Sequence, residues 1–180
     1  MPFDVALQPQ GVYWYHMRAA PVIKHIGVKV LMLCLVVAMS TGSVFAQSVV
    51  VNQDLSFGFI YPGVPKEIDK TTTGSAAEFL VTGTEGDEVS VTFTLPSYMS
   101  QNGFTMQILF PQTSCALDSS AVPDQSSPPV DNIDPYDPFT YRLGSAGLTI
   151  WLGGKVIPKL VQPPGDYTAD IVITVAYTGL

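Results

Sequence analysis

The sequence predicts an all-β fold, an antiparallel β-sandwich of about seven strands. Three observations predict it. Apolar and polar residues alternate through the chain after residue 47, no stretch shows the i, i+3, i+4, i+7 spacing of an amphipathic helix, and turn-forming residues separate the alternating runs. A sheet with one apolar face leaves that face in water unless a second sheet covers it, so two sheets are expected.

Residues 1–46 are expected to be an export signal rather than part of the sandwich. Three basic residues precede its apolar run, namely Arg18, Lys24 and Lys29. The run itself, 30–39, is too short to span a bilayer as a helix, for which about 20 residues are needed. Cleavage is expected between Ala46 and Gln47, with translation starting at Met17. The sequence therefore predicts an exported protein without a membrane anchor, located in the periplasm, at the cell surface or outside the cell.

The remaining chain, 47–180, suits a single domain with one core. It has five basic and fourteen acidic residues, a net charge near −9, so nucleic acid is not an expected partner. It has one cysteine, Cys115, and therefore no internal disulfide. A buried thiol is expected there, and pairing between molecules is the alternative.

Five runs are expected to be strands because every second residue in them is apolar: 49–59, 88–95, 104–110, 148–152 and 167–177. In the first run the inward residues are expected to be Val49, Val51, Leu55, Phe57 and Phe59. In the last run one wall of the core is expected from Tyr167, Ala169, Ile171, Ile173, Val175 and Tyr177. Glycine, proline, asparagine and aspartate predict connections at 82–88, 100–103 and 163–166.

Residues 118–140 are expected to be a long surface loop. The segment holds five prolines, five aspartates and four serines, which can neither complete a sheet ladder nor form a core. Three of its aspartates, Asp131, Asp134 and Asp137, are candidate calcium ligands because calcium binds loop oxygens. Their spacing differs from an EF-hand loop, and solvated carboxylates are the alternative.

The sequence predicts no enzyme and no cofactor. No histidine follows residue 46, so neither a serine nor Cys115 has a base to activate it, and zinc and copper lack their usual ligands. A carboxylate pair can hydrolyse glycosides, but the acids here lie in a turn and in a Pro-rich loop, where solvated carboxylates are expected.

Aromatic residues give one candidate binding patch. Trp151 is out of phase with the inward residues of its strand, and three further aromatics stand at the end of the acidic loop, Tyr136, Phe139 and Tyr141. They predict either an exposed patch for a ligand or a set of contacts that folds the loop back onto the sandwich.

Three stretches together resemble a family of secreted bacterial domains of unassigned function: LSFGFI (55–60), AEFLVTGTEGDEVSVTFTLP (77–96) and the segment 148–177. The matching positions are Leu55, Phe57, Gly58, Phe79, Val81, Gly83, Gly153, Gly154, Pro164, Gly165 and Tyr167. That family is similar to spore-coat-type and chaperone/usher pilin subunits. The acidic loop departs from the pattern, so nothing about it is carried over.

The resemblance implies an immunoglobulin-like sandwich and a pilin-like structural or adhesive surface subunit without a cofactor. The implied partners are other protein subunits, copies of the same chain or an assembly chaperone. Such subunits join by strand addition. The expected donor segment carries Val49, Val50 and Val51, and the strand from Tyr167 to Tyr177 would border the acceptor. The alternative is a self-contained secreted module that binds a ligand or calcium through residues 118–142 and Trp151.

Overall fold

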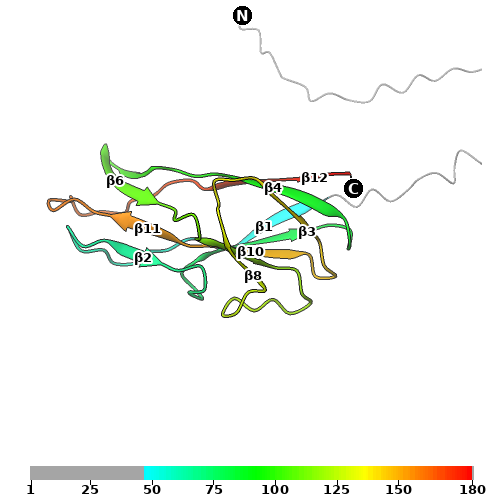
Figure 1. The fold of residues 1–180 in the computed structure, drawn as a ribbon. Coiled ribbons are helices and arrows are strands. Elements are labelled where there is room, and N and C mark those ends of the chain that lie inside the picture. The colour runs from blue at the N-terminus through cyan, green and yellow to red at the C-terminus, as the bar shows by residue number, and fades with distance from the viewer. Residues whose placement is uncertain (1–46, 180) are drawn as a thin grey trace, which may run out of the picture. The chain divides into compact units, whose positions relative to one another are not determined.

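The computed structural model describes residues 47–179, and it is all-β over that range (Figure 1). The expected signal peptide, including Met17 and Ala46, lies outside the described residues. The strands are β1 Ser48–Gln53, β2 Lys66–Ile68, β3 Ala77–Thr82, β4 Glu88–Thr94, β5 Tyr98–Gln101, β6 Phe104–Leu109, β7 Cys115–Asp118, β8 Val130–Ile133, β9 Phe139–Arg142, β10 Leu148–Leu152, β11 Gly154–Ile157 and β12 Val172–Tyr177.

All strand pairs are antiparallel, and they form three sheets. The sheets have the orders β1-β3-β10-β7-β8, β2-β11-β6-β5 and β12-β4-β9. The four-stranded sheet continues the five-stranded one, because only Gly153 separates β10 from β11. In Figure 1, β4 and β12 lie in a layer above β3 and β10.

The core fills the space between these layers. Phe79 of β3 packs on Phe93 of β4 with ring centroids 5.8 Å apart, and Phe93 lies 6.5 Å from Phe139 of β9. The other fully buried apolar side chains come from both layers and include Val81, Val89, Val91, Leu117, Leu148, Ile150 and Leu152. The predicted all-β class, with two apolar faces covering each other, is therefore confirmed.

The described residues form twelve strands rather than about seven, because several strands, such as β2, β5 and β11, lie outside the five predicted runs. The C-terminal run is in addition shorter than predicted. Its Thr168 makes an isolated bridge with Ser100, and regular pairing with β4 starts only at Val172. Ala169 is exposed, whereas Ile171, Ile173 and Val175 pack against the core as expected, although only in part.

The first expected strand is also shorter than predicted. The side chain of Val51 is half exposed although it lies opposite Phe79, and the register of β1 against β3 then shifts between Val51 and Gln53. Gly58 then adopts φ +57°, a conformation that favours glycine, and the chain turns away from the core. The prediction that Phe59 faces inward is wrong, since it is 94% exposed.

Two predicted connections have the expected character. Residues 82–88 form a corner that carries the chain from β3 in one sheet to β4 in another. Residues 100–103 close the β5–β6 hairpin, in which Gln101 pairs with Phe104. The two turn residues, Asn102 and Gly103, have φ of 48° and 84°, which fits the type I′ turn preferred in two-residue hairpins.

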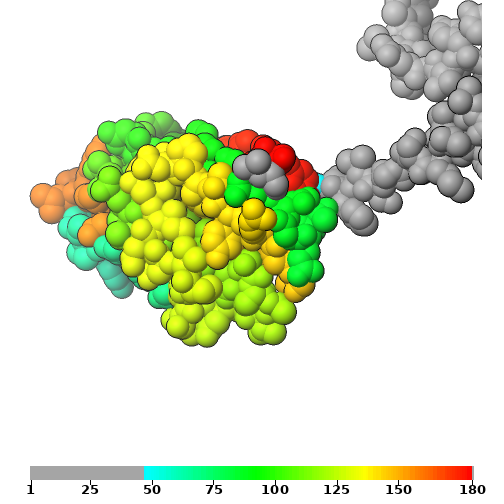
Figure 2. Space-filling view, turned by 45° about the vertical axis from the view of Figure 1, so that its right-hand side comes forward, coloured from blue at the N-terminus to red at the C-terminus, as the bar shows by residue number. Residues whose placement is uncertain are grey.

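The prediction that residues 118–140 contain no strand is wrong in part. The proline-free stretch β8 pairs with β7 at the edge of the five-stranded sheet, with an irregular register. Proline is excluded from central ladders, but the four residues between Pro129 and Asp134 have free backbone N–H groups for pairing. Figure 2 shows the segment around β8, in yellow-green to yellow, spread over one face of the domain.

Candidate functional site

Strands β1 and β12 are the edge strands of two different sheets. In the described chain β1 pairs only with β3, and β12 pairs only with β4. The Gln47 side chain donates a hydrogen bond from Nε2 to the backbone oxygen of Val175, so the two edges lie beside each other. We call these strands, Ser48–Gln53 and Val172–Tyr177, the edge pair.

The edge pair closes the core incompletely. Val49, Ile173 and Val175 pack against the core, yet each stays partly accessible. Val50 and Val51 are about half exposed. A strand with one free edge presents unpaired backbone N–H and C=O groups, which are a template for another strand. The edge pair therefore combines free hydrogen-bonding groups with incompletely covered apolar side chains.

The predicted interaction residues fall at three separate places. Val49, Val50, Val51 and Tyr177 belong to the edge pair, and Tyr177 Oη accepts a hydrogen bond from the Thr84 N–H at 3.2 Å. Tyr167 precedes β12 in a turn, where its hydroxyl donates to the Pro163 oxygen at 2.9 Å. It does not lie in β12, so the two tyrosines do not border a common acceptor strand.

Trp151 is not an exposed contact residue. Its side chain is 2% exposed, and its indole N–H donates to Glu78 Oε2 at 3.1 Å. It lines a hollow together with residues 122–126. The prediction of a surface patch at Trp151 is wrong, because this side chain is buried.

The three candidate calcium ligands do not converge. Asp131 Oδ1 pairs with Lys70 Nζ at 2.8 Å, whereas Asp134 Oδ1 accepts the Tyr136 N–H at 2.9 Å. Across residues 47–179 no three acidic, cysteine or histidine side chains are grouped so that they could hold a metal ion. The three candidate residues therefore do not form a calcium site in the described part of the chain.

Lys70 instead fastens the acidic segment to the sandwich. Its ammonium group is buried and donates to the Thr113 oxygen at 2.7 Å and to Asn132 Oδ1 at 3.2 Å, in addition to its ion pair with Asp131. The Gln125 side chain in turn donates to the Lys70 oxygen at 2.8 Å. A buried ammonium is tolerated when its three hydrogens find acceptors, as they do here.

Cys115 is buried at the start of β7, as predicted. Burial raises the pKa of its thiol to about 12. The charge of Lys70 and the hydrogen bond with Ala116 lower this pKa, but by less than burial raises it. The thiolate is the nucleophile and the metal ligand, so a thiol in this setting is chemically inert near neutral pH.

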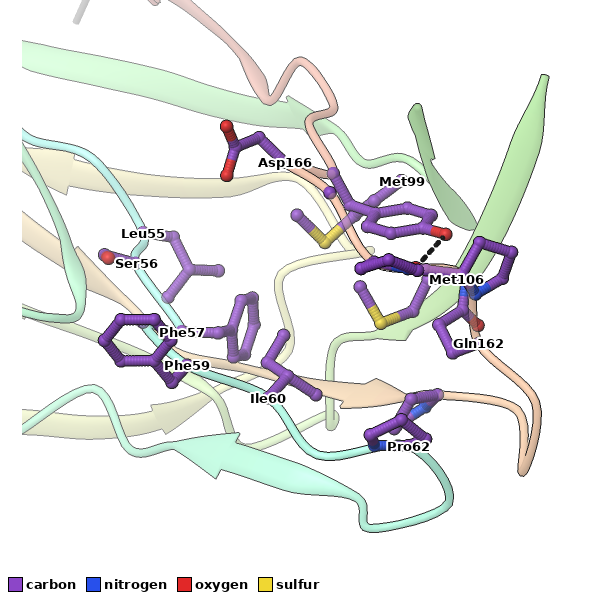
Figure 3. Close-up of a pocket in the computed structure, with 16 residues that line it drawn as sticks. Leu55, Ser56, Phe57, Phe59, Ile60, Pro62, Met99, Met106, Gln162 and Asp166 are labelled. Carbon is purple, nitrogen blue, oxygen red and sulfur yellow. Dashed lines mark hydrogen bonds between the residues drawn. The ribbon is translucent and has the colours of Figure 1, made fainter. Parts of the chain in front are cut away.

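The end of the domain opposite the β3–β4 corner carries a groove that the sequence did not indicate. Figure 3 shows Ile60, Met99 and Met106 around this space, whose volume is about 800 Å³. We call it the end groove. Its lining residues are Leu55, Ser56, Phe57, Gly58, Phe59, Ile60, Pro62, Met99, Met106, Pro158, Gln162, Pro163, Pro164, Gly165, Asp166 and Tyr167.

The rim of the end groove is apolar and exposed. Two loops form it, 58–65 and 158–163, and they are joined by a hydrogen bond from the Gly63 N–H to the Lys159 oxygen at 3.0 Å. Five large apolar side chains of these loops face solvent: Phe59, Tyr61, Val64, Leu160 and Val161. Exposed apolar residues gathered in this way mark contact surfaces more often than isolated ones do.

The described residues contain no helix that is long and apolar enough to cross a membrane. No curated protein matches the chain. One domain family does match it, over residues 63–177, and this range includes all of β12 and nine of the sixteen residues that line the end groove. The chain therefore belongs to the family described as Domain of unknown function (DUF4402).

Proposed function

We propose that this protein is an exported, pilin-like structural or adhesive surface subunit that acts through strand addition with other protein subunits. The observation that supports it is the edge pair, in which two adjacent strands each have one free edge and partly uncovered apolar residues. An extended strand from another chain would supply main-chain hydrogen bonds to the edge of a sheet and cover its accessible apolar side chains.

The donor would be β1 of a neighbouring copy. In the structure β1 is paired with its own β3, and only Val49 of its three valines packs against the core. Its register is broken after Val51, and its side chains contribute little burial. A strand held this weakly exchanges readily with the same strand of a second copy, which is the usual route of domain swapping.

The alternative, a secreted module that binds a ligand or calcium through residues 118–142 and Trp151, is not proposed. It relied on an exposed tryptophan and on three converging aspartates. Trp151 is buried, and Asp131 is paired with Lys70.

A deletion variant tests strand addition. Removal of residues 47–53 frees the outer edge of β3, and we expect this variant to bind a synthetic peptide of residues 47–53, with a rise in Tm. The matched control peptide carries Val49→Asp and is expected not to bind, because a charge then replaces the valine that packs against the core. If the intact chain is monomeric at every concentration and the deletion alters neither its thermal stability nor its assembly, strand addition is excluded.

A further inference from the structure

We infer that the end groove binds a second copy of this chain, which inserts its opposite, acidic end, so that copies join head to tail. This inference rests on the proposed function in one respect only, namely that both require copies to associate. The contact itself is different, because it uses the two ends of the domain rather than the edge pair.

The end groove presents an apolar surface that suits a protein partner. Phe59, Leu160 and Val161 are 94%, 86% and 88% exposed, and they stand beside a hollow whose floor includes Met99 and Met106. Met99 and Met106 have flexible, polarisable side chains that adapt to the shape of a partner. Such a combination of an apolar rim and an adaptable floor fits a protein surface.

Two lysines at this end favour an acidic partner. Lys66 and Lys159 make no ion pair within residues 47–179, where the two pairs are Lys70 with Asp131 and Lys155 with Glu67. The Lys66 ammonium reaches the rim, because it donates to the Phe59 oxygen at 3.2 Å. Asp166 also lines the groove and reduces the positive charge there. Two unpaired lysines are nevertheless notable in a domain whose net charge is near −9.

The opposite end of the domain carries the complementary charge. The β3–β4 corner has Glu85, Asp87 and Glu88 within four residues, with Arg142 as the nearby cation through its bond to the Gly86 oxygen at 3.2 Å. We call these three acids the acidic corner. In Figure 1 the corner and the loops of the end groove lie at the two extremes of the domain, and Figure 2 shows the same separation.

This placement determines the geometry of the assembly. A contact between two different surfaces of identical copies is heterologous, and it continues into an open chain of copies unless the rotation closes a ring.

An anionic membrane is the competing occupant for an apolar surface with lysines. The domain's own negative charge opposes that approach, whereas the acidic corner of a second copy provides complementary charge.

Two variants of the full chain test the inference. The groove variant carries Phe59→Asp and Lys159→Glu, and the corner variant carries Glu85→Lys and Asp87→Lys. We expect the wild-type chain to associate progressively with concentration in sedimentation velocity, and each variant alone to associate about tenfold or more weakly, because like charges then meet at the contact. An equimolar mixture of the two is expected to form dimers that grow no further, since each variant keeps one intact surface.

Two control variants distinguish the head-to-tail contact from a general loss of association and from exchange of β1. Val122→Asp changes a comparably exposed apolar residue outside both surfaces and is expected to leave association unchanged. Deletion of residues 47–53 removes β1 and should leave head-to-tail association in place, so failure of strand addition is distinguishable from failure of this inference. The inference is overturned if the wild type does not associate, if the mixture of variants stays monomeric, or if the groove variant instead loses binding to vesicles containing anionic lipid.

Discussion

Asp118 is a buried carboxylate at the end of β7, and its hydrogen bonds hold the beginning of the acidic segment. Burial alone would raise its pKa, but the N–H groups of Ser120 and Asp124 donate to its two oxygens at 2.7 and 3.0 Å, and the pKa is lowered. The charged form is therefore more favourable in the folded chain than in the unfolded one.

Asp118→Asn should reduce the free energy of unfolding by about 1–2 kcal/mol at pH 7, because an amide NH₂ would then face a backbone donor. Since the folded pKa lies below the unfolded value of about 3.9, the carboxylate stabilises the fold above that pH and ceases to do so as pH falls through the folded pKa. Urea unfolding across this range should show the two proteins converging in acid. The control Asp170→Asn, at an exposed position, should match the wild type throughout.

Cys115 should not react with an alkylating reagent in the native protein at about pH 8. Burial raises the pKa of the thiol to about 12 and also excludes the reagent, so reaction requires unfolding. Mass spectrometry with and without denaturant measures this directly. Labelling of the native protein at the rate of the unfolded chain would show that the thiol is accessible. A disulfide between the Cys115 residues of two molecules would then again be a valid alternative.

Among the strands, the sequence predicted β4 and β10 closely, because simple alternation is interrupted at neither of them. The predicted run 88–95 is observed as Glu88–Thr94, and 148–152 has the predicted bounds. The course of β1 was not predictable to the same extent, because the irregular register after Val51 and the turn at Gly58 end the strand without any change in hydrophobic pattern. β8 was missed because its four residues, in a Pro-rich segment, show no alternation of apolar and polar residues that could be recognised.

The end groove was missed for a different reason. Its walls come from residues 55–62 and 158–167, which are distant in the sequence and meet through the pairing of β2 with β11. Only one local signal was available, the apolar stretch that continues past Gly58 to Tyr61, and the alternating pattern assigned Phe59 to the core. The edge pair was partly predictable, since both of its strands were expected, but their adjacency depends on sheet order.

Lys70→Met should loosen β8 and the segment before it. The substitution removes three hydrogen bonds from a buried ammonium and leaves the Thr113 oxygen without this partner, which we expect to cost about 2 kcal/mol. Limited proteolysis should then cut within residues 119–133 before the rest of the domain. The matched control is Lys155→Met, which removes an exposed ion pair with Glu67 and should change stability by less than about 0.5 kcal/mol. Equal effects of the two substitutions would contradict the anchoring role of Lys70.

At the scale of the whole domain, the two proposed contacts occupy different surfaces. The edge pair is a side of the sandwich, whereas the end groove and the acidic corner are its two extremes. Copies that use both contacts would be joined end to end through the end groove and the acidic corner. Exchange of β1 between neighbouring copies would strengthen the same assembly. The acidic segment takes part in neither contact, because Lys70 and Asp118 hold it against the outer face of the five-stranded sheet.

The bond from the Gln47 side chain to Val175 places residue 47 beside a position only four residues before residue 179. A glycine–serine linker between residues 47 and 179, with new termini opened among the exposed residues 121–123, would give a circular permutant with the same sheets. This permutant has no free end at β1. We expect the permutant to fold and to associate through the end groove as before, but to be unable to donate β1. Sedimentation velocity, with and without the peptide of residues 47–53, would test the association and the loss of donation.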